Sequence, residues 1–191
     1  MRLWMILILP ILLVACSDFK KNKQLDQIND LKSTVDSLEG VWSQENLSEA
    51  SALFDQCSRL IDSISLLYQD QLLDLESAKK IDVIKRCHHQ LDDVLKLEKL
   101  LPTILVEKKS SLLKLKNDVE HGKGRREKYD EYIQFEKDEM ATIRKQFSSY
   151  HDKKMTCVKE VESHMTEIDS ILMVLHKDYS IENKINTLKI K

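Results

Sequence analysis

Residues 126–178 decide the fold, and they read REKYDEYIQFEKDEMATIRKQFSSYHDKKMTCVKEVESHMTEIDSILMVLHKD. Apolar side chains recur there at alternating steps of three and four residues, which is the spacing of one face of an α-helix. At about 1.5 Å per residue, a helix over this range would be roughly 80 Å long, so we expect an elongated molecule. The stripe contains Tyr129, Ile133, Glu136, Met140, Ile143, Phe147, Tyr150, Lys154, Cys157, Val161, His164, Ile168, Ile171 and Leu175.

A second stripe of the same kind covers residues 78–120 and leads into His121-Gly122-Lys123-Gly124, which is typical of a turn that ends a helix. Pro102 lies within this stripe, where it should kink or divide the helix. A chain that folds back at Gly122 brings together residues whose numbers add up to 244 or 245. The resulting pairs match in character: Leu112 with Ile133, Leu105 with Met140, Leu101 with Ile143, Val94 with Tyr150, Ile84 with Val161, Lys108 with Glu136, and Cys87 with Cys157.

Together the two stripes predict an antiparallel hairpin with coiled-coil packing. Two layers fit less well, because Leu91 falls opposite Lys154 and Glu98 falls opposite Phe147. We expect these two layers to be partly exposed. A heptad stripe does not identify its partner helix, so self-association of two chains is an alternative to packing within one chain.

Two shorter helices are expected ahead of the hairpin. Helical spacing covers residues 28–42, where Gly40 should weaken or end the helix. The same spacing resumes over residues 47–68, directly after Asn46, which with Glu49 forms the pattern of a capping box.

The composition supports an all-α chain. Its 191 residues include only 3 Gly and 2 Pro, far fewer than folds rich in sheets and loops require. Charged residues make up 32% and apolar residues 42%, a mixture suited to amphipathic helices around a narrow core. The predicted fold is an elongated antiparallel bundle of three or four helices over residues 25–179, with a flexible tether at 16–24 before it and a C-terminal tail at 180–191.

The sequence argues against several classes of function. A formal net charge of −2 gives no basis for binding nucleic acid. The chain contains no Gly-rich phosphate loop and no CxxC, HExxH or GxSxG motif. A narrow helical bundle also offers little concave surface for a substrate. We therefore expect neither enzymatic activity nor a cofactor.

Three cysteines lie beyond the first sixteen residues. In the hairpin register Cys87 faces Cys157, and in an oxidising compartment the two could form a disulfide that closes a loop of 71 residues. On the chain-entropy model such a bond stabilises by roughly 4 kcal/mol. The alternative is a pair of small buried thiols that never react. Cys57 would join the same layer if the turn expected between 69 and 77 is centred near 72, and would lie elsewhere if it is centred near 77.

Cys87-His88-His89-Gln90-Leu91-Asp92-Asp93 is the one local cluster with the character of metal ligands. Zinc requires three or four converging ligands, and His164 would lie on the facing helix. Nothing in the spacing specifies such a site, and helical His–Asp pairs are typically solvated neighbours. We therefore predict no metal site.

The predicted turn is strongly basic, with Lys123, Arg125, Arg126 and Lys128 close together. Arg125 and Arg126 fall near the start of a helix, where the helix dipole disfavours positive charge. A phosphate, an acidic cell-wall group or an acidic partner could offset this effect. The alternative is a solvated turn that keeps the bundle soluble.

The amino terminus reads MRLWMILILPILLVAC over residues 1–16. Arg2 provides a basic start, and residues 3–15 form an apolar run that is too short to cross about 30 Å of hydrocarbon comfortably. The pattern is typical of a secretory signal peptide, which we assign to residues 1–15.

Leu13-Val14-Ala15-Cys16 resembles the lipobox of bacterial lipoproteins, with small Ala15 directly before the cysteine. The resemblance covers only the first sixteen residues. It implies cleavage between Ala15 and Cys16, a diacylglycerol on the Cys16 sulfur, and acylation of the new amino group by a fatty acid such as palmitate. In Gram-negative lipoproteins an aspartate directly after the cysteine retains the protein in the inner membrane. Because Ser17 occupies that place, the resemblance favours the outer membrane facing the periplasm over the inner membrane.

These features predict a cell-envelope lipoprotein anchored in the bilayer through acylated Cys16. Its helical coiled-coil contacts would hold or space a protein partner without catalysis. One alternative is a periplasmic metal- or redox-active protein that uses Cys87, His88 and Cys157. Another is a structural tether linked to peptidoglycan, because murein lipoprotein is similar in ending with a lysine, here Lys191.

Overall fold

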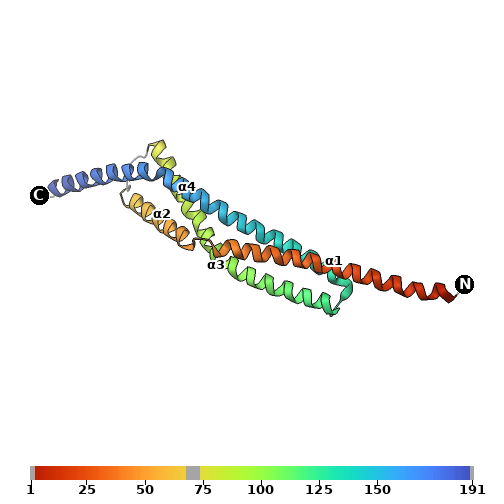
Figure 1. The fold of residues 1–191 in the computed structure, drawn as a ribbon. Helices are drawn as coiled ribbons and strands as arrows, with labels where there is room; N and C mark the ends of the chain where they lie inside the picture. The colour runs from red at the N-terminus through yellow and green to blue at the C-terminus, as the bar shows by residue number, and fades with distance from the viewer. Residues whose placement is uncertain (1–2, 68–73, 190–191) are drawn as a thin grey trace. The chain divides into compact units, whose positions relative to one another are not determined.

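The fold is all-α, as predicted. The computed structural model describes the backbone of residues 3–67 and 74–189 and the side chains of residues 19–67, 74–174, 176 and 177. Within these ranges the chain forms four α-helices and no strand (Figure 1). They are α1 (Leu3–Ser43), α2 (Leu47–Leu67), α3 (Leu75–His121) and α4 (Tyr129–Lys189), with a short 3-10 helix, η1 (Arg126–Lys128), between α3 and α4.

The chain gathers into two compact units where one bundle domain over residues 25–179 was expected. Unit 1 comprises Met1–Glu45 and Leu100–Phe147, and unit 2 comprises Asn46–Lys99 and Ser148–Lys191. Helices α3 and α4 contribute one half to each unit. Unit 1 completes its bundle with α1 and unit 2 with α2.

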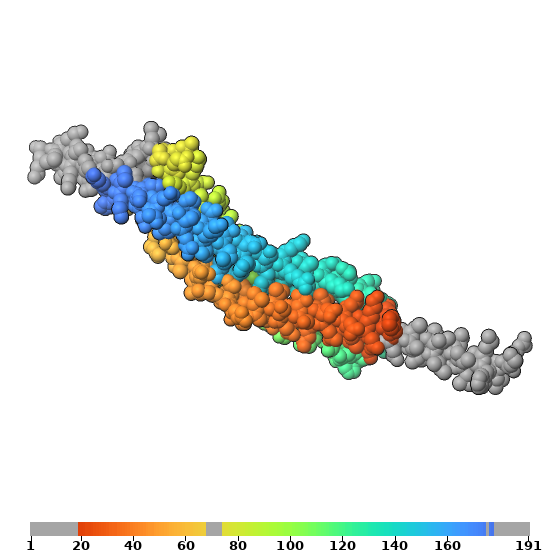
Figure 2. All heavy atoms as spheres, turned by 45° about the horizontal axis from the view of Figure 1, so that its top comes forward, coloured from red at the N-terminus to blue at the C-terminus, as the bar shows by residue number. Residues whose placement is uncertain are grey.

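In unit 1, α1 packs along the hairpin formed by the second half of α3 and the first half of α4. Figure 2 shows the side chains of α1 lying against those of the first half of α4. Trp42 meets the ring of Phe147 edge to face at 5.7 Å, and Lys109 binds Asp36 and Glu39 at 3.0 and 2.5 Å. The buried core consists of Ile28, Val35, Leu105, Leu112, Leu115, Val119, Tyr129, Ile133, Met140 and Ile143.

In unit 2, α2 takes the place of the third helix. Five of its side chains, at steps of three and four, are buried: Ala50, Leu53, Cys57, Leu60 and Ile64. The other two helices bury Ile81, Ile84, Cys87, Leu91, Val94, Tyr150, Cys157, Val161 and Ile168. Their apolar stripes therefore supply both cores.

The predicted hairpin register is confirmed in both units. In unit 1, Lys108 Nζ lies 2.6 Å from Glu136 Oε2. In unit 2, the Cys157 thiol donates to the backbone oxygen of Cys87 at 3.6 Å. One turn determines the offset between the two helices of the hairpin. The remaining layers therefore follow the same register as these two pairs.

Two layers of the hairpin were expected to be partly exposed, and for the layer of Leu91 and Lys154 this prediction was wrong. Leu91 is fully buried and Lys154 is 2% exposed. Burial of Lys154 is tolerated because its ammonium group donates to Asn46 O at 2.9 Å and binds the Glu49 carboxylate at 2.9 Å. Glu98 and Phe147 are half-buried, as expected.

The helix ends follow local chemistry. Asp74 caps α3 by accepting bonds from the backbone N–H groups of Glu76 and Ser77 at 3.0 Å each. Gly122, with φ +62°, ends α3, and the N–H of Lys123 reaches back to Asp118 O at 2.8 Å. The expected turn after Gly122 is therefore present.

Neither Pro102 nor Gly40 ends the helix in which it lies. Pro102 lies inside α3, which it does not divide, and its neighbours Leu101 and Leu105 are buried. Their packing offsets the hydrogen bond that the proline ring removes. Gly40 lies inside α1, which continues to Ser43.

The expected tether and tail are helical. Residues 19–24 belong to α1. The side chain of Gln24 is 5% exposed, and its amide is satisfied there by donating to the Asp130 carboxylate at 2.6 Å. Helix α4 continues past Tyr179 to Lys189, over a stretch without Gly or Pro to end it. In the described part of the chain, no helix has an apolar stretch long enough to span a membrane.

Candidate functional site

Three cysteines from three helices lie in one layer of unit 2, which we call the thiol layer: Cys57 of α2, Cys87 of α3 and Cys157 of α4. All three are buried and are present as free thiols. The Cys157 thiol lies 3.6 Å from the backbone oxygen of Cys87 and 3.4 Å from Gln90 Oε1. Cys57 joins the layer, since its thiol lies close enough to Cys87 and Cys157 for their charges to interact. The centre of the turn between α2 and α3 lies outside the described residues.

The three thiols differ in acidity. Burial, together with the nearby charge of Cys87, raises the pKa of Cys57 to about 11. A hydrogen bond from the Cys157 thiol lowers the pKa of Cys87, although burial opposes this effect. The same bond, and then burial, raise the pKa of Cys157. Cys87 is therefore the thiol that most readily becomes a thiolate, which is the nucleophile in disulfide exchange.

The structure brings Cys87 and Cys157 together, but His88 points elsewhere. Its ring stacks on Phe54 with centroids 4.3 Å apart, and its Nε2 lies 3.0 Å from Ser58 Oγ. His164 lies near Glu160 and Glu167, 3.8 and 3.5 Å from their carboxylates. Among the residues that the structure describes, no three His, Cys, Asp or Glu side chains converge as metal ligands. The disulfide between Cys87 and Cys157 stays a prediction.

Unit 1 buries a charged network around Lys108. Besides Glu136, Lys108 Nζ contacts Glu139 Oε2 at 2.7 Å, and Ser111 Oγ donates to Glu136 Oε1 at 2.5 Å. Burial, the largest single effect, lowers the pKa of Lys108, but its bonds to the two carboxylates together raise the pKa above the ordinary value. The register predicted the Lys108–Glu136 pair, whereas Ser111 and Glu139 gave no signal in the sequence.

Arg126 of the basic turn lines a hollow at the end of unit 1. The hollow has a volume of about 500 Å³, and residues of α1 supply the opposite wall. Lys20, Lys21, His121 and Arg126 bring positive or titratable groups to its lining, and Glu120 and Glu127 bring carboxylates. The sequence indicated the basic turn but not the part played by Lys20 and Lys21. No pattern in the sequence shows that residue 21 will contact residue 120, which lies 99 positions away.

The proposed lipidation site lies just before the first described contacts of α1. The side chains of Ala15 and Cys16 lie outside the described residues, as does Lys191. From Lys20 onward α1 contacts the hairpin: Lys20 binds Asp130 at 2.9 Å, and Lys21 donates to the backbone oxygen of Glu120 at 2.8 Å.

No protein-family model, no curated protein and no solved structure matches this chain.

Proposed function

We propose that this chain is a lipid-anchored envelope protein, cleaved between Ala15 and Cys16, whose helical units hold or space a partner without catalysis. The observation that carries the proposal is Leu13-Val14-Ala15-Cys16 at the end of an apolar run of thirteen residues, 3–15. Two or three acyl chains on Cys16 would hold the protein stably, since each buried CH₂ contributes about 0.8 kcal/mol. Ser17 after the cysteine favours the outer membrane facing the periplasm.

Helix α1 packs against unit 1 a few residues beyond the proposed cleavage site. Phe19 is 74% exposed, and Lys20 and Gln24 both bind Asp130 of α4. Cys16 precedes this packed region by only a few residues, so an anchor there would hold unit 1 close to the bilayer.

Exposed apolar side chains support a role in helical contacts. On α3, Val106 and Leu113 are 65% and 47% exposed. They are seven residues apart and so lie on one face of the helix. Large apolar side chains in such positions suit contact with another helix, of a partner or of a second copy of the chain.

The anchor is tested by the intact mass of the protein isolated from the membranes of a bacterium that expresses the full chain. We expect a mass that lacks residues 1–15 and carries two or three acyl chains. The Cys16→Ala variant should retain residue 1 and gain no acyl mass. A wild-type chain that keeps Met1, or that begins at Ser17 without lipid, would contradict the proposal.

The partner is tested by crosslinking in intact cells, with Val106→Lys/Leu113→Lys as the interface variant and Lys32→Gln as the control. We expect the variant to lose crosslinks that the control retains. Sedimentation equilibrium of the wild type then separates a second copy of the chain from another protein.

A second candidate function uses the thiol layer. Contact between Cys157 and the backbone of Cys87, together with the lowered pKa of Cys87, favours thiol–disulfide exchange with an envelope disulfide donor. Burial of both thiols restricts access for such a donor, so we rank this candidate below the anchored interaction protein. If the chain carries out this exchange, a small disulfide such as oxidised glutathione should convert the folded chain to the form with a Cys87–Cys157 disulfide.

A further inference from the structure

We propose that the hollow at the end of unit 1, lined by Lys20, Lys21, His121 and Arg126, binds the phosphate head group of an anionic phospholipid. The inference rests on the proposed anchoring of Cys16 and adds a second, specific contact with the bilayer. Neither the signal sequence nor the bundle fold implies such a site.

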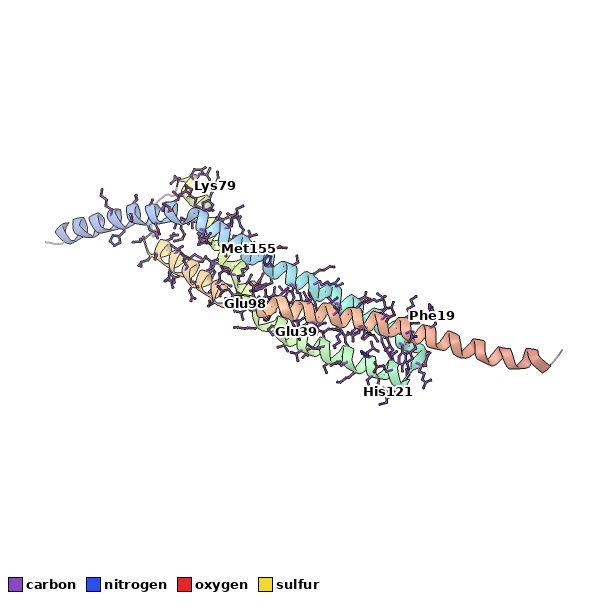
Figure 3. The ribbon with its side chains drawn as sticks, in the orientation of Figure 1. Phe19, Glu39, Lys79, Glu98, His121 and Met155 are labelled. Atoms are coloured by element: carbon purple, nitrogen blue, oxygen red, sulfur yellow. The ribbon has the colours of Figure 1, made fainter. Side chains whose placement is uncertain are left out.

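The first observation is the charge of this end. Residues 19–23 and 121–128 together contain seven lysines and arginines against one acidic residue, Glu127, in a chain whose formal net charge is −2. In Figure 3, Phe19 and His121 lie at the same end of unit 1, so these two segments meet there. Such a concentration of positive charge favours anions.

Few of these cations are neutralised locally. Lys20 binds Asp130 at 2.9 Å and Lys128 binds Glu131 at 3.3 Å. Across the residues with described side chains, Lys123, Arg125 and Arg126 form no ion pair. The Glu120 carboxylate, which also lines the hollow, lies 3.8 Å from Lys116, one turn back along α3.

The second observation is that Arg126 is held in place over the turn. Its Nε donates to Gly122 O at 2.7 Å, a bond that does not use its two terminal nitrogens, and Arg126 lines the hollow. A Cβ on Gly122 would lie 2.3 Å from Arg126 Nη2, so the guanidinium occupies space that only glycine provides. A guanidinium fixed by one hydrogen bond is well suited to bind a phosphate through its remaining donors.

Lys21 is fixed on the opposite wall. Its Nζ donates to the backbone oxygen of Glu120 at 2.8 Å, which places the ammonium group at the end of α3. His121 is oriented by a contact of 2.9 Å between its Nδ1 and Asn117 O, so its Nε2 faces away from α3. The lysine of α1, the histidine of α3 and the arginine of η1 therefore line one hollow.

The third observation distinguishes a lipid from a free anion. Phe19, 74% exposed, lies next to Lys20 and three residues after Cys16. At about 1.5 Å per residue, Lys20 lies roughly 6 Å along the helix from Cys16. An exposed aromatic ring beside a basic cluster is the pattern of segments that lie in the membrane interface. An anchor at Cys16 would hold the hollow at the level of the head groups.

The test is native mass spectrometry of the full chain, purified in detergent and mixed with phosphatidylglycerol, phosphatidylcholine or soluble glycerol phosphate. We expect wild type to retain one phosphatidylglycerol in preference to phosphatidylcholine. The Lys21→Gln/Arg126→Gln variant should bind it roughly 30-fold more weakly, at about 1 kcal/mol per lost cation. The Lys32→Gln/Lys114→Gln variant removes two charges elsewhere on unit 1 and should bind like wild type.

Equal retention of the two lipids, or unchanged retention by Lys21→Gln/Arg126→Gln, would overturn the head-group site. Soluble glycerol phosphate that binds as tightly as phosphatidylglycerol would assign the hollow to a free anion instead, which also overturns the lipid proposal. The same spectra report the mass of the chain itself. An unprocessed amino terminus counts against the proposed anchor, whereas lost lipid selectivity in a processed, acylated chain counts against the head-group site alone.

Discussion

Replacement of Lys108 by methionine should destabilise unit 1 severely. The side chains of Lys108 and Glu136 are each 7% exposed, and among the described side chains only Lys108 forms an ion pair with the buried Glu136 carboxylate. After Lys108→Met, the hydroxyl of Ser111 is the one hydrogen-bond donor that Glu136 keeps among the described side chains. Breaking a buried pair by removing one partner costs about 3–5 kcal/mol, which is a large part of the stability of an ordinary domain.

Two further variants separate the buried pair from its exposed neighbour. Glu139 also contacts Lys108, but its side chain is 47% exposed, so Glu139→Gln should cost at most about 1 kcal/mol. Lys108→Met/Glu136→Leu replaces both buried charges by apolar groups and should lie within about 1 kcal/mol of wild type. The two single substitutions at Lys108 and Glu136 should therefore be strongly non-additive.

The assay is urea unfolding of the full chain, followed by circular dichroism of the helices. At a slope of about 2 kcal/mol per molar, Lys108→Met should lower the urea midpoint of the unit 1 transition by roughly 2 M. The raised pKa of Lys108 means that its stabilising effect is fully present below the ordinary lysine pKa and declines only as pH rises through the higher folded value. The loss should thus be equal at pH 6 and pH 8. If Lys108→Met costs less than 1 kcal/mol, or as little as Glu139→Gln, the reasoning about burial is refuted.

Three further predictions concern unit 2 and the turn. Alkylation of the unfolded, unreduced protein from the envelope should label Cys57 alone, because Cys87 and Cys157 are joined; three labelled thiols would exclude the disulfide. Lys154→Met should lower the free energy of unfolding by about 1–3 kcal/mol, because the Asn46 carbonyl loses the lysine as a donor. Lys153→Met removes a more exposed pair with Asp93 and should lower it by under about 1 kcal/mol. Equal losses of the two variants in urea unfolding would contradict this. Gly122→Ala and Gly124→Ala should each lower the free energy of unfolding by about 1–2 kcal/mol, because both glycines have positive φ. Of the two, Gly122→Ala alone displaces Arg126 and should weaken retention of phosphatidylglycerol. Equal lipid retention by the two variants would be evidence against the role of Arg126.

The sequence was sufficient to predict the hairpin and its register. Apolar steps of three and four residues are local information, and Gly122 marks where the chain turns. Once the turn is placed, the offset between the two helices determines every layer, so Lys108–Glu136 and Cys87–Cys157 follow by arithmetic. The same arithmetic could not predict the burial of Lys154, because its partners Asn46 and Glu49 belong to another helix.

The lipobox is likewise local, since it depends on four consecutive residues, 13–16. The hollow proposed to bind a lipid head group is different, because Lys21 and Glu120 are 99 positions apart and meet only when α1 packs against the hairpin. The division into two units also arises only in the folded chain, where α1 and α2 each bury their apolar stripe against a different half of α3 and α4. Periodicity along one helix specifies which face is buried, whereas the identity of the helix that covers it depends on the sum of contacts between segments distant in the sequence.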